Sequence, residues 1–249
     1  MKIEGIFFDM GGTIDLYPRR ERSVINACVK MKRMLEDAGA YQISRFSENE
    51  FRNIVLNGIK NYKNWRIEKD IELSSENFFC DFVLAGTGVD DKITNAIGED
   101  LAFLIDVGFY ERIPRPEAAE VFKVIKDKGI KMGIISNVIS RTQVGSNLKK
   151  YGFNEYFDPI VLSSVFGKRK PHPDIFHYAF KEAGINPANI IFVGNSPTKD
   201  IAGARNVGVG KTVYIDYFET PPDEMGPVAD YNIKDLRELI LIIDELKKI

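Results

Sequence analysis

Short apolar runs that alternate with amphipathic helices constrain the fold of this chain more than any other feature of its sequence. Beyond Pro116, segments with helical apolar spacing alternate with short runs of almost wholly apolar residues. The apolar runs are 132–135, 160–162, 190–193 and 212–215, and the helical segments are about 117–128, 140–151, 173–184, 198–207 and from about 234 onward. Strands without polar alternation are typical of a parallel sheet covered by helices on both faces. We therefore predict an α/β fold.

A second segment of the chain has helical periodicity only. Between residues 18 and 106, apolar residues recur at three- and four-residue steps in four stretches. Such a series of amphipathic helices is typical of a small bundle. The strand-like run 3–8 precedes this segment and belongs with the sheet. We predict an α/β core made of residues 1–16 and 113–249, with residues 17–112 inserted as a four-helix domain.

The composition excludes several classes of protein. Among 249 residues, 34 Lys and Arg face 36 Asp and Glu, a net charge of −2, which argues against a nucleic-acid-binding protein. No apolar run approaches the roughly 18 residues of a membrane span, and the first residues lack a signal-peptide layout. Cys28 and Cys80 are too few for a disulfide scaffold. We expect a cytoplasmic protein with no membrane or nucleic-acid partner, whose oligomeric state the sequence leaves open.

Polar residues follow four of the predicted strands. Asp9 ends the first strand, Ser136 and Asn137 follow the second, Lys170 lies beyond the third, and 195–200 follow the fourth. In an open parallel sheet, ligands bind at the carboxyl ends of the strands. These residues therefore converge on one predicted site.

The residue types at this site suit an anionic ligand. The turn Asp9-Met10-Gly11-Gly12-Thr13 places a carboxylate beside glycines whose backbone N–H groups can face an anion. Lys170 offers a fixed positive charge, and Asp200 can help to hold Mg²⁺, which prefers oxygen ligands. Ser136 and the N–H of Asn137 suit phosphoryl oxygens at the start of a helix. The set predicts nucleophilic attack by a carboxylate on a small anionic substrate.

At this point the chain resembles the haloacid dehalogenase superfamily, in the subgroup with a helical C1-type cap. The matching segments, in the family's order, are Phe8-Asp9-Met10-Gly11-Gly12-Thr13, Ile134-Ile135-Ser136-Asn137, Gly167-Lys168-Arg169-Lys170-Pro171-His172-Pro173 and Val193-Gly194-Asn195-Ser196-Pro197-Thr198-Lys199-Asp200. The resemblance covers the predicted core, whereas the inserted helices match only by position and helical character. It implies a Rossmann-like parallel sheet with a four-helix cap.

The resemblance also implies an activity and a set of site residues. The activity is hydrolysis of a small phosphorylated metabolite by a Mg²⁺-assisted phosphatase. Asp9 resembles the nucleophile that becomes an aspartyl-phosphate, and Lys170 resembles the charge that steadies it. The implied substrate-binding residues are Gly12, Thr13, Ser136 and Asn137, and the implied metal ligands are Asp9, the Gly11 carbonyl, Asn195 and Asp200.

Two residues depart from the family's pattern. Gly11 stands where phosphatases of the family usually carry an Asp as general acid and base, and Asn195 stands where they usually carry an Asp that binds metal. We therefore expect weak Mg²⁺ binding and slow turnover of alkyl phosphates. An Asp restored at position 11 should speed alkyl phosphate turnover if the loop has room. We expect Asp15 to have left the turn already, toward the inserted helices.

These departures leave two other functions open. One is a catalytically impaired protein that binds a phosphorylated ligand or a partner without turnover. The other is a metal-independent 2-haloacid dehalogenase, a group that also lacks the second Asp but usually carries an aromatic residue where this chain has Gly11. Ser136 and Asn137 could also simply cap the following helix, and Asp200 could be a carboxylate favoured at a helix start.

Overall fold

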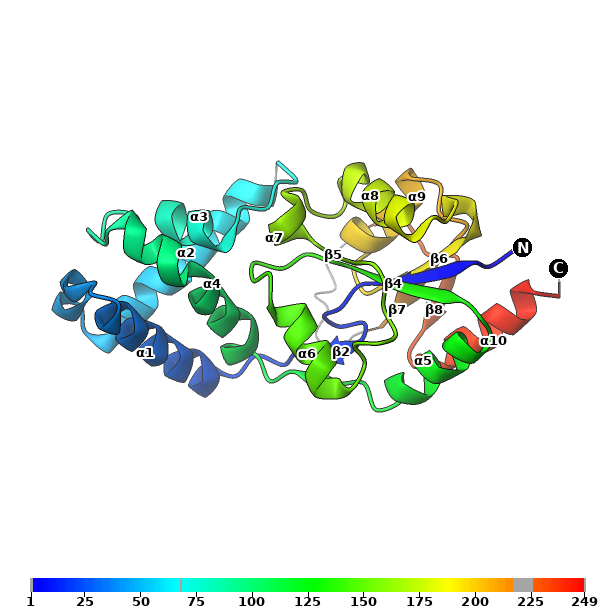
Figure 1. Ribbon diagram of the computed structural model, residues 1–249, viewed down its shortest axis with the longest axis horizontal. Coiled ribbons are helices and arrows are strands. Elements are labelled where there is room, and N and C mark those ends of the chain that lie inside the picture. Colours follow the sequence, from blue (N-terminus) through cyan, green and yellow to red (C-terminus); the bar gives the residue numbers. More distant parts are fainter. Residues whose placement is uncertain (1, 68, 217–225, 249) are drawn as a thin grey trace. The chain divides into compact units, whose positions relative to one another are not determined.

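A computed structural model describes residues 2–67, 69–216 and 226–248 of the chain (Figure 1). Contacts between residues divide the chain into two compact units. The α/β unit comprises Met1–Tyr17, Arg112–Asn137 and Val144–Ile249, and the helical unit comprises Pro18–Glu111 and Val138–Gln143. The chain thus passes between the units at four places, and the short segment 138–143 groups with the helices.

The described part of the α/β unit contains a six-stranded parallel sheet. Its strands, in spatial order, are β5 (Ile160–Leu162), β4 (Lys131–Ser136), β1 (Gly5–Phe8), β6 (Ile190–Gly194), β7 (Lys211–Ile215) and β8 (Tyr231–Ile233). Strand β1 is central, so the turn that begins at Asp9 follows a strand with neighbours on both sides. The predicted α/β fold is confirmed. The apolar pattern did not predict β8, because its sequence Tyr-Asn-Ile has a polar centre.

Helices cover both faces of this sheet. They are α5 (Ala118–Asp127), α6 (Gln143–Tyr151), α7 (Ser163–Phe166), α8 (Pro173–Ala183), α9 (Ala202–Asn206) and α10 (Arg237–Leu246). Figure 1 shows α8 and α9 on one side of the sheet and α5 and α10 on the other. Successive residues of β1 divide between the faces: the Phe7 ring lies 4.9 Å from that of Phe180 in α8, and the Phe8 ring lies 5.6 Å from that of Phe122 in α5.

A small antiparallel ribbon flanks the first-strand turn. Strand β2 (Asp15–Leu16) pairs with β3 (Ile113–Pro114), with Asp15 opposite Pro114 and Leu16 opposite Ile113. Two-residue strands give too short a pattern to be read from sequence. The ribbon brings the residue after β2, Tyr17, beside the residue before β3, Arg112.

The helical unit is built around its own apolar core. Its elements are α1 (Glu21–Asp37), the 3₁₀ turn η1 (Tyr41–Arg45), α2 (Glu48–Ile67), α3 (Ser75–Phe78) with the π-helical turn η2 (Phe79–Val83), and α4 (Asp91–Gly108). Met31, Phe51, Phe78 and Leu101 from four of these helices are fully buried together. No helix among the described residues is both long and apolar enough to cross a membrane.

Candidate active site

Lys170 joins two carboxylates at the carboxyl ends of β1 and β6. Its Nζ lies 2.7 Å from Asp9 Oδ1, directly after β1, and 2.7 Å from Asp200 Oδ1, in the turn after β6. The lysine side chain is 1% exposed and that of Asp200 is 2% exposed, so little water screens these charges. Three residues that are far apart in the sequence therefore form one buried ionic cluster with two negative groups and one positive group.

The protonation states in this cluster favour a nucleophile. Burial raises the pKa of the Asp9 carboxyl to about 6, although Lys170 opposes the rise and Asp200 adds to it. Burial alone would lower the pKa of Lys170, but the charges of Asp200 and Asp9 outweigh it, and the pKa of the ammonium is raised. Near neutral pH, Lys170 is therefore a cation and Asp9 is mostly ionised.

Backbone contacts hold Lys170 in place. The Asn137 side chain donates from Nδ2 to the Lys170 carbonyl at 2.9 Å, and its Oδ1 accepts from the Lys170 N–H at 2.8 Å. Asn137 follows β4, whose last residue, Ser136, is buried. The side-chain amide of Asn137 is thus engaged with Lys170, which leaves its backbone N–H, rather than its side chain, for the predicted contact with substrate.

Asp200 has a protein partner at each carboxylate oxygen. Its Oδ1 pairs with Lys170, and its Oδ2 accepts from the Ser196 backbone N–H at 2.9 Å. The π-helical turn η4 (Pro197–Ile201), which Ser196 caps, produces this geometry. In this arrangement Asp200 orients Lys170 rather than presenting a free carboxylate.

The turn after β1 passes close to the loop after β6. Gly12 has a φ of +86°, a conformation that favours glycine, and a Cβ at this position would overlap the Asn195 side-chain amide. Arg115, which is buried, donates from Nη2 to the Gly12 carbonyl at 2.9 Å and to the Asp216 carbonyl at 3.1 Å. The Thr13 hydroxyl is buried and has no hydrogen-bond partner within the described residues.

The expectation that Asp15 leaves the turn is wrong. The backbone folds back, so that the Gly12 N–H donates to the Asp15 carbonyl at 2.6 Å, and the Asp15 side chain is fully buried. Its carboxylate accepts from Arg112 Nη1 at 3.1 Å and from Tyr151 Oη at 3.1 Å. The sequence could not show this, because an antiparallel ribbon of two-residue strands supplies the arginine.

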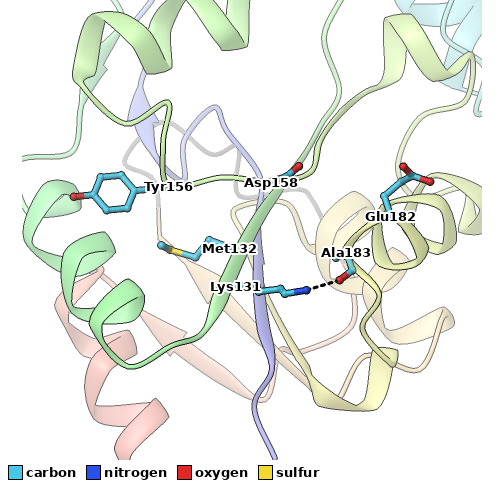
Figure 2. A pocket seen from close by; sticks show the side chains of 6 residues that line it. All are labelled: Lys131, Met132, Tyr156, Asp158, Glu182 and Ala183. Carbon is cyan, nitrogen blue, oxygen red and sulfur yellow. Dashed lines mark hydrogen bonds between the residues drawn. The ribbon is translucent and has the colours of Figure 1, made fainter.

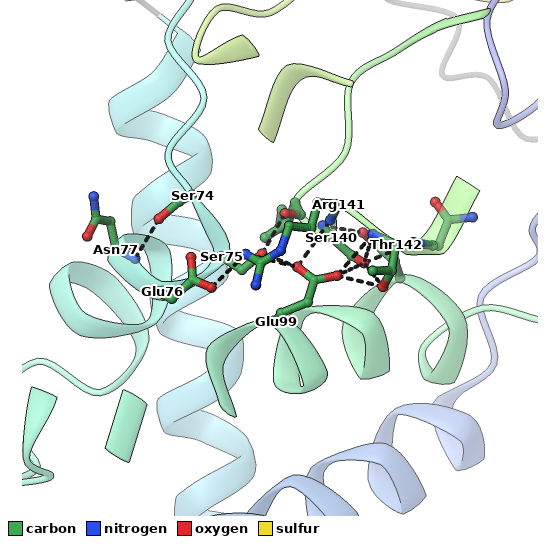
Figure 3. A network of polar contacts seen from close by, with 11 residues as sticks. Ser74, Ser75, Glu76, Asn77, Glu99, Ser140, Arg141 and Thr142 are labelled. Carbon is green, nitrogen blue, oxygen red and sulfur yellow. Dashed lines mark hydrogen bonds and ion pairs between the residues drawn. The ribbon is translucent and has the colours of Figure 1, made fainter. Parts of the chain in front are cut away.

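The segment after Asn137 is anchored within the helical unit (Figure 3). Glu99 of α4 accepts hydrogen bonds from the side chains and backbone of this segment and from Ser75: Ser140 Oγ at 2.6 Å, Thr142 Oγ1 at 2.7 Å, Thr142 N at 3.0 Å, Arg141 N at 3.1 Å and Ser75 Oγ at 2.6 Å. Arg141 also pairs with Glu76 at 2.6 Å. A single carboxylate therefore fixes the backbone that follows Ser136 and Asn137.

A cavity in the α/β unit lies at the other end of the sheet (Figure 2). It has a volume of about 240 Å³ and is lined by Lys131, Met132, Tyr156, Asp158, Glu182 and Ala183. Lys131 begins β4, whereas Ser136 ends it, and Lys131 Nζ is engaged by the Ala183 carbonyl at 3.0 Å. None of the predicted site residues lines this cavity, which lies at the amino ends of the strands.

Comparisons with known proteins agree on one family. A family model described as haloacid dehalogenase-like hydrolase matches residues 3–208. The glyceraldehyde 3-phosphate phosphatase of Methanocaldococcus jannaschii is 30% identical over 249 residues, which is 99% of each chain. A HAD phosphatase from Thermococcus onnurineus has a similar structure, with a TM-score of 0.63, 22% identity, and coverage of 97% of this chain and 98% of that one. A 2-haloacid dehalogenase from Pseudomonas syringae pv. Tomato DC3000 gives a TM-score of 0.68 at 17% identity, with coverage of 98% and 99%.

Proposed function

Because this chain belongs to the haloacid dehalogenase-like hydrolase family, we propose that it is a phosphatase that transfers the phosphoryl group of a small phosphate ester first to Asp9 and then to water. The observation that carries this proposal is the contact of Lys170 Nζ with both Asp9 and Asp200 at 2.7 Å. A buried cation keeps the nucleophilic carboxylate ionised and offsets its repulsion from a phosphate dianion. The 30% identity to a glyceraldehyde 3-phosphate phosphatase supports phosphoryl transfer as the reaction.

In the first step, an Asp9 carboxylate oxygen attacks phosphorus and the bond to the leaving-group oxygen breaks. The phosphoryl oxygens are bound by the Ser136 hydroxyl, the Thr13 hydroxyl and backbone N–H groups of the turn that contains Gly12. The Thr13 hydroxyl has no hydrogen-bond partner among the described residues, and as a fully buried group it would reach a phosphoryl oxygen only after a small shift of the turn. Lys170 neutralises charge that Asp9 and the phosphoryl group share.

The oxygen donors around Asp9 fit a weakly held Mg²⁺. The Asp9 carboxylate, the Gly11 carbonyl and the Asn195 amide oxygen would hold it, and the Asn195 side chain lies against Gly12. Asp200, the fourth ligand predicted from the sequence, already has a protein partner at each carboxylate oxygen. The other three donors are one carboxylate and two neutral oxygens. When bound, Mg²⁺ supplies positive charge to the phosphoryl oxygens, and it usually keeps several of its waters.

The second step, hydrolysis of the aspartyl-phosphate, proceeds without a general base at position 11. A positioned acid or base typically contributes about 10²–10⁴-fold in rate. We therefore expect a rapid release of the leaving group in the first turnover, followed by a slower steady state that is limited by loss of phosphate from Asp9.

The proposal is tested by assaying the protein with Mg²⁺ on glyceraldehyde 3-phosphate, p-nitrophenyl phosphate, acetyl phosphate and 2-chloropropionate. We expect phosphate release from the phosphorylated compounds and no halide release. Asp9→Asn should abolish turnover, because an amide does not attack phosphorus. Asp9→Asn activity above about a tenth of the wild-type rate is far more than loss of a covalent nucleophile allows, and would refute the mechanism.

A second function, binding of a phosphorylated ligand without turnover, is favoured by one observation. A Cβ on Gly11 would lie 3.0 Å from Tyr17 Cε1 and 3.6 Å from Arg112 Nη1, so an aromatic ring and a cation occupy the space beside Gly11 instead of an acid. Tight binding of inorganic phosphate without hydrolysis of any of the four compounds would support this function over the phosphatase.

A further inference from the structure

The space beside Gly11 is filled by an aromatic ring and a cation. A Cβ built on Gly11 would lie 3.0 Å from Tyr17 Cε1 and 3.6 Å from Arg112 Nη1. Gly11 lies two residues after Asp9 in the turn that follows β1, and Met10 between them is fully buried. The guanidinium of Arg112 therefore lies beside the space that a side chain at position 11 would occupy, two residues along the turn from Asp9.

The ribbon of β2 and β3 holds Arg112 in this place. Because Asp15 pairs with Pro114 and Leu16 with Ile113, the next pair in register is Tyr17 and Arg112. The guanidinium carbon lies 5.3 Å from the centre of the Tyr17 ring, and Nη1 contacts both Asp15 oxygens at 3.1 and 3.3 Å. Tyr151 donates to the same carboxylate at 3.1 Å. An arginine side chain that is only 11% exposed is thus fixed from two sides.

We propose, on the basis of the proposed function, that Arg112 is a catalytic residue that stabilises the negative charge on the leaving-group oxygen, in place of a general acid at position 11. The resemblance to the family's phosphatases assigns position 11 to the group that assists the leaving oxygen, and a preorganised cation acts most strongly where charge develops in a site that excludes water. The arginine assists by charge and by hydrogen bonds alone, since its guanidinium does not give up a proton in proteins.

Bonds, electrons and charge balance in this step. An Asp9 oxygen forms a bond to phosphorus, the bond from phosphorus to the leaving oxygen breaks, and the electron pair of that bond stays on the oxygen. The products are the aspartyl-phosphate and the leaving group as an anion, paired with Arg112. Water protonates that anion after release. The total charge of ester dianion and carboxylate is conserved.

This arrangement predicts a substrate class. A leaving group that is stable as an anion, such as a carboxylate from an acyl phosphate or a phenolate from an aryl phosphate, needs only the charge of Arg112. A simple alkoxide would need a proton that the arginine does not supply. Acyl and aryl phosphates should therefore be better substrates than alkyl phosphates.

The test compares Arg112→Gln with the wild type on phenyl, chlorophenyl and p-nitrophenyl phosphates. Removing one charge-stabilising donor typically costs about 10²–10³-fold in rate. We expect that loss on phenyl phosphate, the poorest leaving group, and a clearly smaller loss on p-nitrophenyl phosphate. Arg112→Lys, which keeps the charge, should restore much of the difference. Arg237→Gln, which removes an exposed arginine paired with Asp235, is the matched control and should change nothing.

Rapid-quench kinetics with p-nitrophenyl phosphate separate the two steps. Arg112→Gln should slow the release of nitrophenol in the first turnover and leave the later hydrolysis of the aspartyl-phosphate unchanged, because that step has no leaving group. Equal losses across the series, equal slowing of both phases, or no loss at all would overturn the assignment of Arg112.

A double variant separates the role of Arg112 from the stability of its partner Asp15. Arg112→Gln leaves the buried Asp15 carboxylate without its cation, so Asp15→Asn/Arg112→Gln, which removes both charges, should show the same dependence on leaving group. If the double variant instead behaves like the wild type, the proposal is wrong. Failure of the proposed function has a different signature: the wild type itself would release no phosphate from any ester, or Asp9→Asn would remain active.

Discussion

Restoring an aspartate at position 11 should not by itself restore general acid catalysis. The new side chain would meet the Tyr17 ring, since its Cβ would lie 3.0 Å from Cε1, a distance tighter than about nine in ten real Cβ contacts. The ring must shift by a few tenths of an ångström, and a side chain turned about 30° from its rotamer typically costs about 0.5–1.5 kcal/mol. The loop therefore tolerates Gly11→Asp only at a cost.

The charge of Arg112 has the larger effect on such a variant. Its Nη1 lies 3.6 Å from the Cβ position, within ion-pair reach of the new carboxylate. Two unit charges about 4 Å apart interact by about 4 kcal/mol at an effective dielectric constant of about 20, and an adjacent arginine typically lowers the pKa of an aspartate by about 1–3 units. The pKa of the new Asp would therefore fall well below its ordinary value of about 3.9. The protonated fraction near neutral pH would drop by a further factor of about 10–10³.

That loss cancels most of the roughly 10²–10⁴-fold that a positioned acid provides. We expect Gly11→Asp to change kcat/KM on an alkyl phosphate, such as glycerol phosphate, by less than about 10-fold. In an Arg112→Gln background, the same substitution should raise that kcat/KM by about 10² or more, with a smaller gain on p-nitrophenyl phosphate. A gain of about 10² from Gly11→Asp in the presence of Arg112, or equal gains in both backgrounds, would refute this reasoning.

Three other substitutions test the rest of the site. Asn195→Asp adds a charge to the proposed metal donors and should tighten Mg²⁺ binding in calorimetry, and an unchanged affinity would show that residue 195 does not face the metal. Asn137→Ala leaves the Lys170 backbone N–H and carbonyl without their amide partner, so the free energy of unfolding in urea should fall by about 1–3 kcal/mol; an unchanged midpoint would contradict this. Burial opposes ionisation of Glu99, but hydrogen bonds from Ser140, Ser75 and Thr142 lower its pKa below the ordinary 4.5. Its contribution to stability is therefore complete above that value and is lost as the pH falls through the lowered pKa. Glu99→Gln should be less stable than the wild type at about pH 7, and the difference should shrink as the pH falls below 4.5. A difference that stays constant with pH would contradict this.

The sequence by itself determined the sheet and the polar ends of its strands. Continuous apolar runs bounded by helical segments identify buried parallel strands, since each face of such a sheet must be covered. The rule that ligands bind beyond the carboxyl ends then selects Asp9, Lys170 and Asp200 without knowledge of any distance. The structure brings these three within ion-pair distance because β1 and β6 are adjacent and parallel.

Only the tertiary structure decided what surrounds these residues. The Asn137 side chain accepts a hydrogen bond from the Lys170 backbone, and the Ser196 backbone N–H donates to the second oxygen of Asp200. Both contacts depend on how the loops fold, which residue types alone do not show. Arg112 reaches the space beside Gly11 because a ribbon of two-residue strands closes 97 positions along the chain from Asp15. Strands of two residues are too short to show a periodic pattern. A glycine at position 11 likewise gives no sequence signal of which side chains occupy the space beside it. The chemistry at position 11 is therefore a property of packing.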